Sequence, residues 1–141
     1  KGIASDEEDE DDVYKPSGGL LRLFQSELFN SWMAMAYLLK HDEVGIQYYL
    51  CSRMRDLPTH ELLFLLPQLC HLAVTRDNAS TPVESLLMEL CRRSVHASVN
   101  LLWLLESYIV DYAGDSVTPN ARAVQRSVRL LREVQRASFG T

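Results

Sequence analysis

Apolar positions recur along most of this chain at helical spacing, and no segment shows the alternation of a β-strand. The pattern predicts helices over Leu20–Phe29, Trp32–His41, Glu43–Met54, His60–Thr75, Pro82–Arg93, Val95–Tyr112 and Thr118–Ala137. Short loops join these segments, which is typical of antiparallel neighbours. We therefore expect an all-α, solenoid-like array of about six to seven antiparallel helices.

Polar residues and prolines predict where several of these helices begin. Asn30 or Ser31 is expected to cap the second helix, Asp42 the third and Thr59 the fourth. Pro67 lies inside the fourth helix, where it removes a backbone hydrogen bond. Because the apolar periodicity resumes directly after it, we expect one kinked helix rather than two.

The last two predicted helices carry more apolar surface than packing in a solenoid requires. In Val95–Tyr112 the apolar residues are Leu101, Leu102, Trp103, Leu104, Leu105, Tyr108, Ile109 and Val110. The helix after Pro119 places Val124, Val128, Leu131 and Val134 on one face and arginines opposite. Calcium sensors of the EF-hand class bind such amphipathic helices in apolar grooves. Two alternatives remain open: both helices only cap the solenoid, or the basic terminal helix lies on an anionic membrane.

Charge is distributed unevenly along the chain. Asp6–Asp12 is a run of seven carboxylates, and Ser5 directly before it fits an acidophilic kinase site or simply a solvated tail. Removing this run from the 19 acidic residues leaves 12 against 14 basic ones, so the body is nearly neutral. We expect residues 1–19 to form a disordered acidic linker, 20–113 a helical domain, and 114–141 a loop and a basic amphipathic helix.

Motifs of nucleotide, metal and nucleic-acid chemistry are missing from the sequence. It contains neither GxxxxGK[ST] nor GxGxxG, and its four histidines are scattered. The cysteines Cys51, Cys70 and Cys91 are odd in number and lie in apolar helical patterns, as buried thiols of a reducing compartment do. No aromatic residues lie beside the terminal arginines to stack on bases. We expect no catalytic, cofactor or metal site in this segment, and no nucleic-acid partner.

Three motifs together resemble the accessory helical domain of phosphoinositide kinases. They are GIQYYLCSRM at Gly45–Met54, HELLFLLPQL at His60–Leu69, and LLMELCRRSVHASVNLLWLLESY at Leu86–Tyr108. The opening LLRLFQSELF and the form GIQYYLC are most similar to type III phosphatidylinositol 4-kinases of the beta class, particularly the fungal ones. The resemblance covers Leu20 to about Leu131. Leu65-Leu66 depart from it, because an aromatic residue often precedes the proline in that family.

The resemblance implies a cytoplasmic enzyme, peripheral to Golgi membranes, that phosphorylates phosphatidylinositol with ATP and Mg²⁺ in a kinase domain downstream of this segment. It also implies a frequenin-type EF-hand calcium sensor as partner, and a Rab-type GTPase as another. The sensor would bind the regions matching Val99–Val110 and Ala121–Val134. The matching residues are Leu101, Leu102, Trp103, Leu105, Tyr108, Ile109, Val124, Val128 and Leu131. The alternative is a stand-alone α-solenoid scaffold or adaptor in membrane trafficking.

Overall fold

The computed structural model describes residues 18–25, 30–76, 80–112 and 118–140. Over these residues the chain forms helices and no strand, which confirms the predicted all-α class. The helices are α1 Gly18–Gln25, α2 Ser31–Lys40, α3 Val44–Met54, α4 Thr59–Phe64, α5 Leu66–Thr75, α6 Ser80–Arg93, α7 Val95–Tyr112 and α8 Thr118–Phe139. Residues 1–17 of the predicted acidic linker and the boundary at residue 113 fall outside the described residues. Gly18 and Gly19, which were placed in that linker, begin α1.

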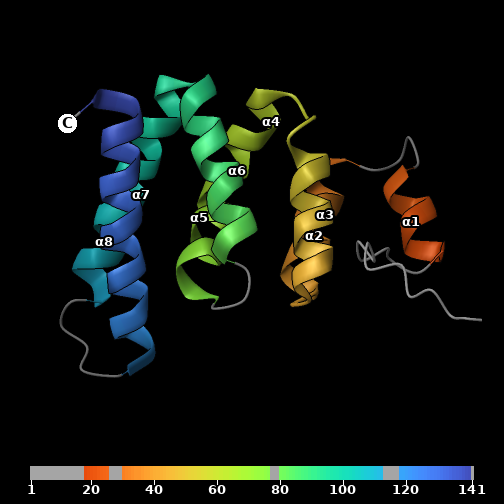
Figure 1. The fold of residues 1–141 in the computed structure, drawn as a ribbon, viewed down its shortest axis with the longest axis horizontal. Helices are drawn as coiled ribbons and strands as arrows, with labels where there is room; N and C mark the ends of the chain where they lie inside the picture. Colours follow the sequence, from red (N-terminus) through yellow and green to blue (C-terminus); the bar gives the residue numbers. More distant parts are fainter. Residues whose placement is uncertain (1–17, 26–29, 77–79, 113–117, 141) are drawn as a thin grey trace, which may run out of the picture.

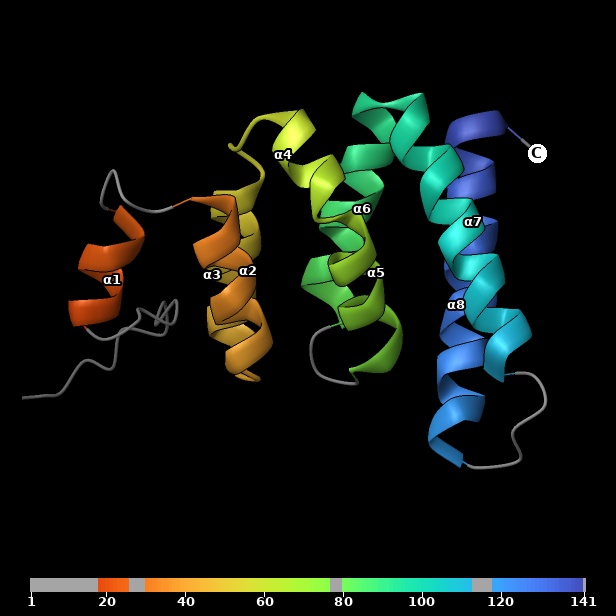
Figure 2. The same cartoon turned by 180° about the vertical axis from the view of Figure 1, so that it is seen from behind.

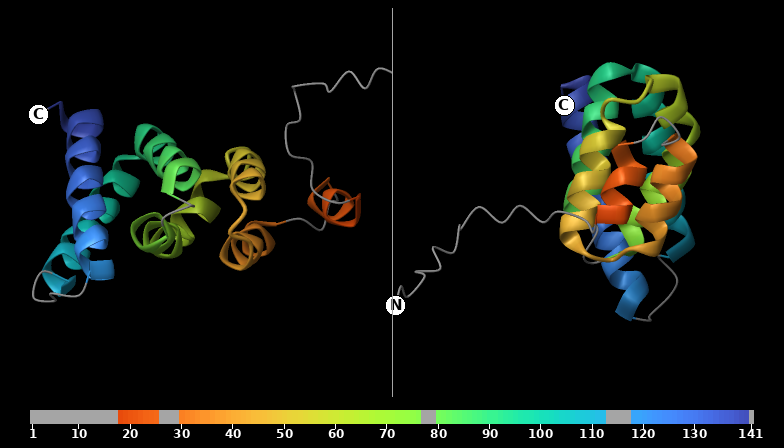
Figure 3. Two further views of the ribbon diagram at one scale, coloured as in Figure 1. Left: turned by 60° about the horizontal axis from the view of Figure 1, so that its bottom comes forward. Right: turned by 90° about the vertical axis from the view of Figure 1, so that its right-hand side faces the viewer.

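The helices stand side by side in successive pairs, which gives the molecule a solenoid-like shape (Figure 1). Helices α3, α6 and α8 line one side of the stack, while α2, α5 and α7 line the other (Figure 2). In the tilted view at the left of Figure 3, α2 and α3, then α5 and α6, then α7 and α8 follow one another. Helix α8 packs closely on α7 and also contacts α5 and α6, so it belongs to the same stack.

The core follows the line of pairs and is richest at α5 and α6. These helices bury Leu66, Leu69, Cys70, Leu72, Ala73, Val74, Val83, Leu86, Leu87 and Leu90. Burial of one large aliphatic side chain contributes about 1.5–3 kcal/mol, so this middle pair anchors the fold. Within the described part of the chain, no helix is long and apolar enough to cross a membrane.

The predicted single helix with a kink at Pro67 is two helices. Leu65 interrupts it with φ −91° and ψ 0°, and its amide donates to the Leu62 carbonyl at 3.1 Å to close a turn. Pro67 is therefore in the first turn of α5, where its missing N–H leaves no hydrogen bond unmade. In a continuous helix its ring would have met the carbonyl of Leu63. The expectation was wrong because a break costs less here than a strained helix.

Two of the three predicted caps are also wrong. Asn30 caps α2 as predicted, since its Oδ1 accepts from the Met33 amide at 2.9 Å. Helix α3, however, begins after Glu43 without a side-chain cap, and Asp42 instead pairs with Arg76 at 3.0 Å. Thr59 is the first residue of α4 rather than its cap.

Arg76, directly after α5, satisfies the open carbonyls at the end of α2. Its guanidinium donates to the Leu38 carbonyl at 3.0 Å and to the Leu39 carbonyl. The buried Gln47 of α3 also donates to the Leu38 carbonyl, at 2.9 Å. Helix C-termini carry orphan carbonyls and a partial negative charge, so a guanidinium there is doubly favourable.

Helix α8 is rotated relative to the sequence expectation. The predicted apolar face was Val124, Val128, Leu131 and Val134, but the residues buried in the structure are Ala123, Ser127, Leu130 and Val134. Small side chains at 123 and 127 let α8 approach its neighbours closely, and the Ser127 hydroxyl donates to the Ala123 carbonyl at 2.8 Å. Val124 and Val128 consequently lie half-exposed on a flank.

Candidate docking surface

Helix α7 has a core face and a separate exposed apolar face. Its buried residues are Ala97, Ser98, Leu101 and Leu105. The exposed apolar residues are Val95 (71% exposed), Val99 (40%), Trp103 (72%) and Val110 (75%). Steps of four, four and seven residues keep these four side chains on one side of a helix, opposite the core. We call them the outer face of α7.

A local cap fixes the start of this helix and so the orientation of its outer face. Ser94 separates α6 from α7, and its hydroxyl accepts from the Ala97 amide at 3.3 Å. The Ser98 amide donates to the Ser94 carbonyl at 3.2 Å. The chain therefore turns from α6 into α7 within a single residue, which gives the helix little freedom to rotate.

The structure brings only some of the predicted docking residues to the surface. Leu101 and Leu105 have no exposed surface and are core residues in this arrangement. The half-buried ones are Leu102, Tyr108, Ile109, Val124, Val128 and Leu131. Trp103 is the one predicted residue that is largely exposed. The surplus of apolar residues on α7 thus divides into a buried face and the outer face.

Three outer-face residues, Val95, Val99 and Val110, were not among the predicted docking residues. The signal was present in the sequence, because each lies on the same side of a helix as Trp103. It was hidden by the apolar residues of the core face, which fill the intervening positions. A helix that is apolar on both sides gives no amphipathic stripe from which the outer residues could be separated.

Tyr108 is held on the core side of α7 by a contact with α5. Its hydroxyl lies 2.9 Å from Nδ1 of His71, and its ring stacks on Tyr112 with centroids 5.8 Å apart. Burial, and to a lesser degree the neighbouring Cys70, raises the pKa of Tyr108 to about 12. The side chain is therefore a neutral structural contact between two helices.

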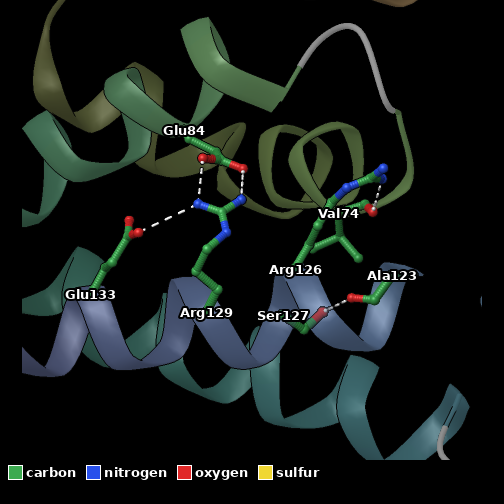
Figure 4. Close-up of polar contacts among 7 residues, drawn as sticks. All are labelled: Val74, Glu84, Ala123, Arg126, Ser127, Arg129 and Glu133. Carbon is green, nitrogen blue, oxygen red and sulfur yellow. Dashed lines mark hydrogen bonds and ion pairs between the residues drawn. The ribbon is translucent and has the colours of Figure 1, made fainter. Parts of the chain in front are cut away.

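The basic residues of α8 are partly used in contacts within the stack (Figure 4). Arg126 donates to the Val74 carbonyl at the end of α5, at 3.0 Å. The Arg129 guanidinium forms a bidentate ion pair with the Glu84 carboxylate of α6, at 2.6 and 3.0 Å. It also pairs with Glu133 at 3.3 Å. The Glu84 carboxylate accordingly raises the pKa of Arg129.

Beside these contacts, α8 bears a shallow hollow of about 450 Å³. Its lining comes entirely from α8: Val124, Gln125, Val128, Arg129, Arg132, Glu133 and Arg136. Arg132 and Arg136 are exposed there. A second hollow of about 420 Å³ lies where α6 and α8 meet near Arg55, and its lining is mostly charged. Neither has the enclosed apolar character of a small-molecule site.

Metal and nucleophile chemistry finds little support among the described side chains. No group of three histidine, cysteine or acidic residues converges there to hold a metal ion. All three cysteines are buried, and burial raises the pKa of Cys51 and of Cys70 to about 12. Such thiols stay protonated and unreactive. The surface of α7 and α8 is thus the strongest candidate for function.

Comparison with known proteins places the helices in a family. Residues 33–106 match the family model described as PI4KB/PIK1, accessory (PIK) domain. This match runs from α2 to within the last two turns of α7 and leaves out α8. No solved structure matches the chain significantly.

Curated relatives agree with the family model. "Phosphatidylinositol 4-kinase pik1" of Schizosaccharomyces pombe is 29% identical over 117 residues, covering 82% of this chain and 13% of that protein. "Phosphatidylinositol 4-kinase PIK1" of Saccharomyces cerevisiae is 33% identical over 128 residues, covering 90% of this chain and 12% of that protein. "Phosphatidylinositol 4-kinase beta 2" of Arabidopsis thaliana is 33% identical over 95 residues, covering 67% of this chain and 8% of that protein. The chain spans only about an eighth of the fungal relatives, and it belongs to the accessory (PIK) domain family of beta-class phosphatidylinositol 4-kinases.

Proposed function

We propose that this chain is the non-catalytic N-terminal helical domain of a 1-phosphatidylinositol 4-kinase, and that it is a docking platform for a frequenin-type calcium sensor. Family membership supports the first part, because the relatives are named phosphatidylinositol 4-kinases. Conversion of phosphatidylinositol to its 4-phosphate, with ATP and Mg²⁺, would belong to a kinase domain elsewhere in the parent chain. The parent would act in the cytoplasm, peripherally on Golgi membranes.

One observation carries the second part: Trp103 is 72% exposed in the middle of the outer face of α7. An exposed tryptophan flanked by valines at helical spacing is the arrangement that helix-binding grooves accept. Calcium-loaded EF-hand sensors open such an apolar groove. Their carboxylate-rich surroundings would also suit the exposed Arg132 and Arg136 of α8.

This surface needs no rearrangement of the helical stack. Val99, Trp103 and Val110 are exposed while Leu101 and Leu105 remain in the core. A sensor can therefore bind the outer face without separating α7 from α5 or α8. The resemblance also names a Rab-type GTPase, but no contact among the described residues singles out a surface for it, and we assign it none.

A calorimetric titration of the 141-residue chain with a calcium-loaded frequenin-type sensor tests the docking proposal. Central aromatic anchors of interfaces contribute about 2 kcal/mol or more, so Trp103→Ala should raise the dissociation constant about 30-fold or more. Trp32→Ala is the matched control, because Trp32 is 60% exposed on α2 at a distance along the stack. If the sensor bound the unaltered chain and the Trp103→Ala variant equally well, or did not bind the chain at all, the proposal would be contradicted.

The kinase parentage has a separate test. Reading the gene beyond the codon for Thr141 should reveal a lipid kinase domain in the same frame. The isolated chain should not convert phosphatidylinositol with ATP and Mg²⁺, whereas the full-length protein should. A reading frame without a kinase domain would instead favour the stand-alone scaffold.

A further inference from the structure

The end of α8 is joined to α7 through two serine hydroxyls. Ser138, in the last turn of α8, has its Oγ 2.7 Å from Oγ of Ser98 on α7. Ser98 is completely buried, and its Oγ lies 3.2 Å from the Cys91 carbonyl and 3.4 Å from the Ser94 carbonyl. Carbonyls only accept, so Ser98 can give its single proton to one of them, and Ser138 is then the donor to Ser98. The opposite direction, from Ser98 to Ser138, would leave both carbonyl contacts without a proton.

The sequence around Ser138 has the charge pattern of a substrate for a basophilic protein kinase. Arg136 precedes the serine by two residues, Arg132 by six, and Phe139 follows it. Both arginines and Phe139 are exposed. Kinases select substrates largely through charged residues near the acceptor hydroxyl. None of these residues is used by the core.

The acceptor serine also lies where a helix opens most easily. Helix α8 ends at Phe139, and Gly140 follows in the left-handed region with φ +66°. Beyond the helix, the Gly140 amide donates to the Arg136 carbonyl at 3.2 Å. Terminal turns open at little free-energy cost, so Ser138 can reach a kinase without unfolding of the stack.

We propose that Ser138 is a phosphorylation site for a basophilic protein kinase, and that its phosphate separates the last turns of α8 from α7. In this reaction the Ser138 oxygen attacks the γ-phosphorus of ATP. The bond from that phosphorus to ADP breaks, and the hydroxyl proton passes to the base of the kinase. The product is a phosphoserine and ADP.

Two physical effects drive the separation in the same direction. Phosphoserine has lost the hydroxyl proton that Ser138 gives to Ser98, and its oxygens are acceptors carrying about −1.5 to −2 charge at neutral pH. Such a group cannot be held against a fully buried hydroxyl at the present 2.7 Å separation. It also lies at the C-terminus of α8, where the helix dipole disfavours negative charge.

Cys91 reports the separation directly. It is 6% exposed, and its thiol and carbonyl both adjoin Ser98, which is the partner of Ser138. Burial is the main cause of its raised pKa, so uncovering it increases both access and the thiolate fraction. Cys51 and Cys70 lie in the core on α3 and α5, and they serve as internal controls.

Ser94 provides a matched control serine. Arg92 and Arg93 precede it, so the same class of kinase can recognise it. Its hydroxyl, however, caps the N-terminus of α7, where the helix dipole favours an anion. A negative charge at Ser94 should therefore leave α8 in place, although Ser94 is also a neighbour of Ser98.

The test treats the 141-residue chain with a purified basophilic kinase and ATP, maps the phosphate by mass spectrometry, and measures alkylation of each cysteine by iodoacetamide. Loss of a hydrogen bond together with an unfavourable charge predicts that alkylation of Cys91 accelerates about tenfold in the Ser138-phosphorylated chain and in Ser138→Glu. Cys51 and Cys70 should react at unchanged rates, as should all three cysteines in Ser94→Glu. Ser138→Ala loses the hydrogen bond but gains no charge, so Cys91 should accelerate much less there than in Ser138→Glu.

Three results would overturn the proposal. The kinase could leave Ser138 unmodified while modifying Ser94. Cys91 could react in Ser138→Glu no faster than in Ser138→Ala. All three cysteines could accelerate together, which would indicate general unfolding instead of separation of α8.

Discussion

Helices α5 and α7 are about equally apolar, yet the stack uses them differently. Six of the ten residues of α5 are buried, including Leu66, Leu69 and Leu72. Helix α7 is longer but buries four residues, and it leaves Trp103 and Val110 largely exposed. Apolar content alone therefore does not determine burial in such a fold.

The difference follows from position in the stack. Helix α5 belongs to the middle pair and contacts α2, α4, α6, α7 and α8. Helix α7 belongs to the last pair, and its packing partners are α5, α6 and α8. A helix with fewer neighbours keeps an apolar face for which the fold supplies no cover. Such faces on soluble proteins commonly mark interaction sites.

The largest expected effect on stability comes from the core of α5. Leu69→Ala should lower the free energy of unfolding by about 2–5 kcal/mol, because it leaves a cavity in a fully buried site. Val110→Ala on the outer face of α7 should change it by less than about 0.5 kcal/mol. Urea denaturation followed by circular dichroism measures both. Similar losses in the two variants would remove the distinction between the helices.

Alkaline pH should destabilise the protein through the buried thiols. The pKa of Cys51 and Cys70 is raised from 9.0 to about 12 in the folded state, because burial disfavours the thiolate. The unfolded chain therefore loses protons first, so stability is fully present below pH 9 and falls as the pH rises from 9 towards 12. Tyr108 of α7, whose pKa is also raised to about 12, adds to this fall above pH 10.

Urea titrations from pH 7 to 11 under reducing conditions measure this dependence. Cys70→Ala should reduce the loss of stability above pH 9, because it removes the buried thiol of α5. Tyr108→Phe should leave the onset near pH 9 in place and reduce only the part above pH 10. Stability that does not change with pH up to 11 would contradict the burial of these groups.

A smaller effect is expected for the ion pair that joins α8 to the middle pair. Arg129 and Glu84 form a bidentate contact, but Arg129 is half-exposed, so solvent screens it. A double-mutant cycle of Arg129→Met and Glu84→Gln should give a coupling free energy of about 0.5–1 kcal/mol. The coupling should shrink in high salt. Arg132→Met, at an exposed neighbouring position, should change stability very little.

The smallest expected change in stability is that of Trp103→Gln. Since the side chain is mostly exposed in the folded state, its replacement should alter the unfolding free energy by less than about 0.5 kcal/mol. Urea denaturation followed by circular dichroism measures this change. A large loss of stability would mean that Trp103 belongs to the core.

The sequence predicted the helices well and their rotation less well. Apolar periodicity located α7 at its observed bounds, and Asn30, one of two residues expected to cap α2, is its cap. The break at Leu65 was missed, because periodicity continues through it and does not register a change of axis. The face of α8 was misjudged because Ala123 and Ser127 are buried for being small, a property that an apolar count does not reveal.

The candidate surface could be predicted only in part for a related reason. The sequence indicated that α7 has surplus apolar residues, and Trp103 was among those predicted to bind a partner. It could not indicate that Leu101 and Leu105 face the core while Val99 and Val110 face outward. That assignment depends on which neighbours surround α7, and those neighbours come from distant parts of the chain.

Two guanidinium groups at the end of α5 connect the three helix pairs of the stack. Arg76, just after the helix, holds the end of α2, and Arg126 of α8 holds the carbonyl of Val74, two residues before Arg76. Repeats of a solenoid usually unfold from the ends, each depending on its nearest neighbour. Here, fraying at one short turn would release both the first and the last pair together. The stack should consequently melt as a single cooperative unit, with the end of α5 as its weakest point.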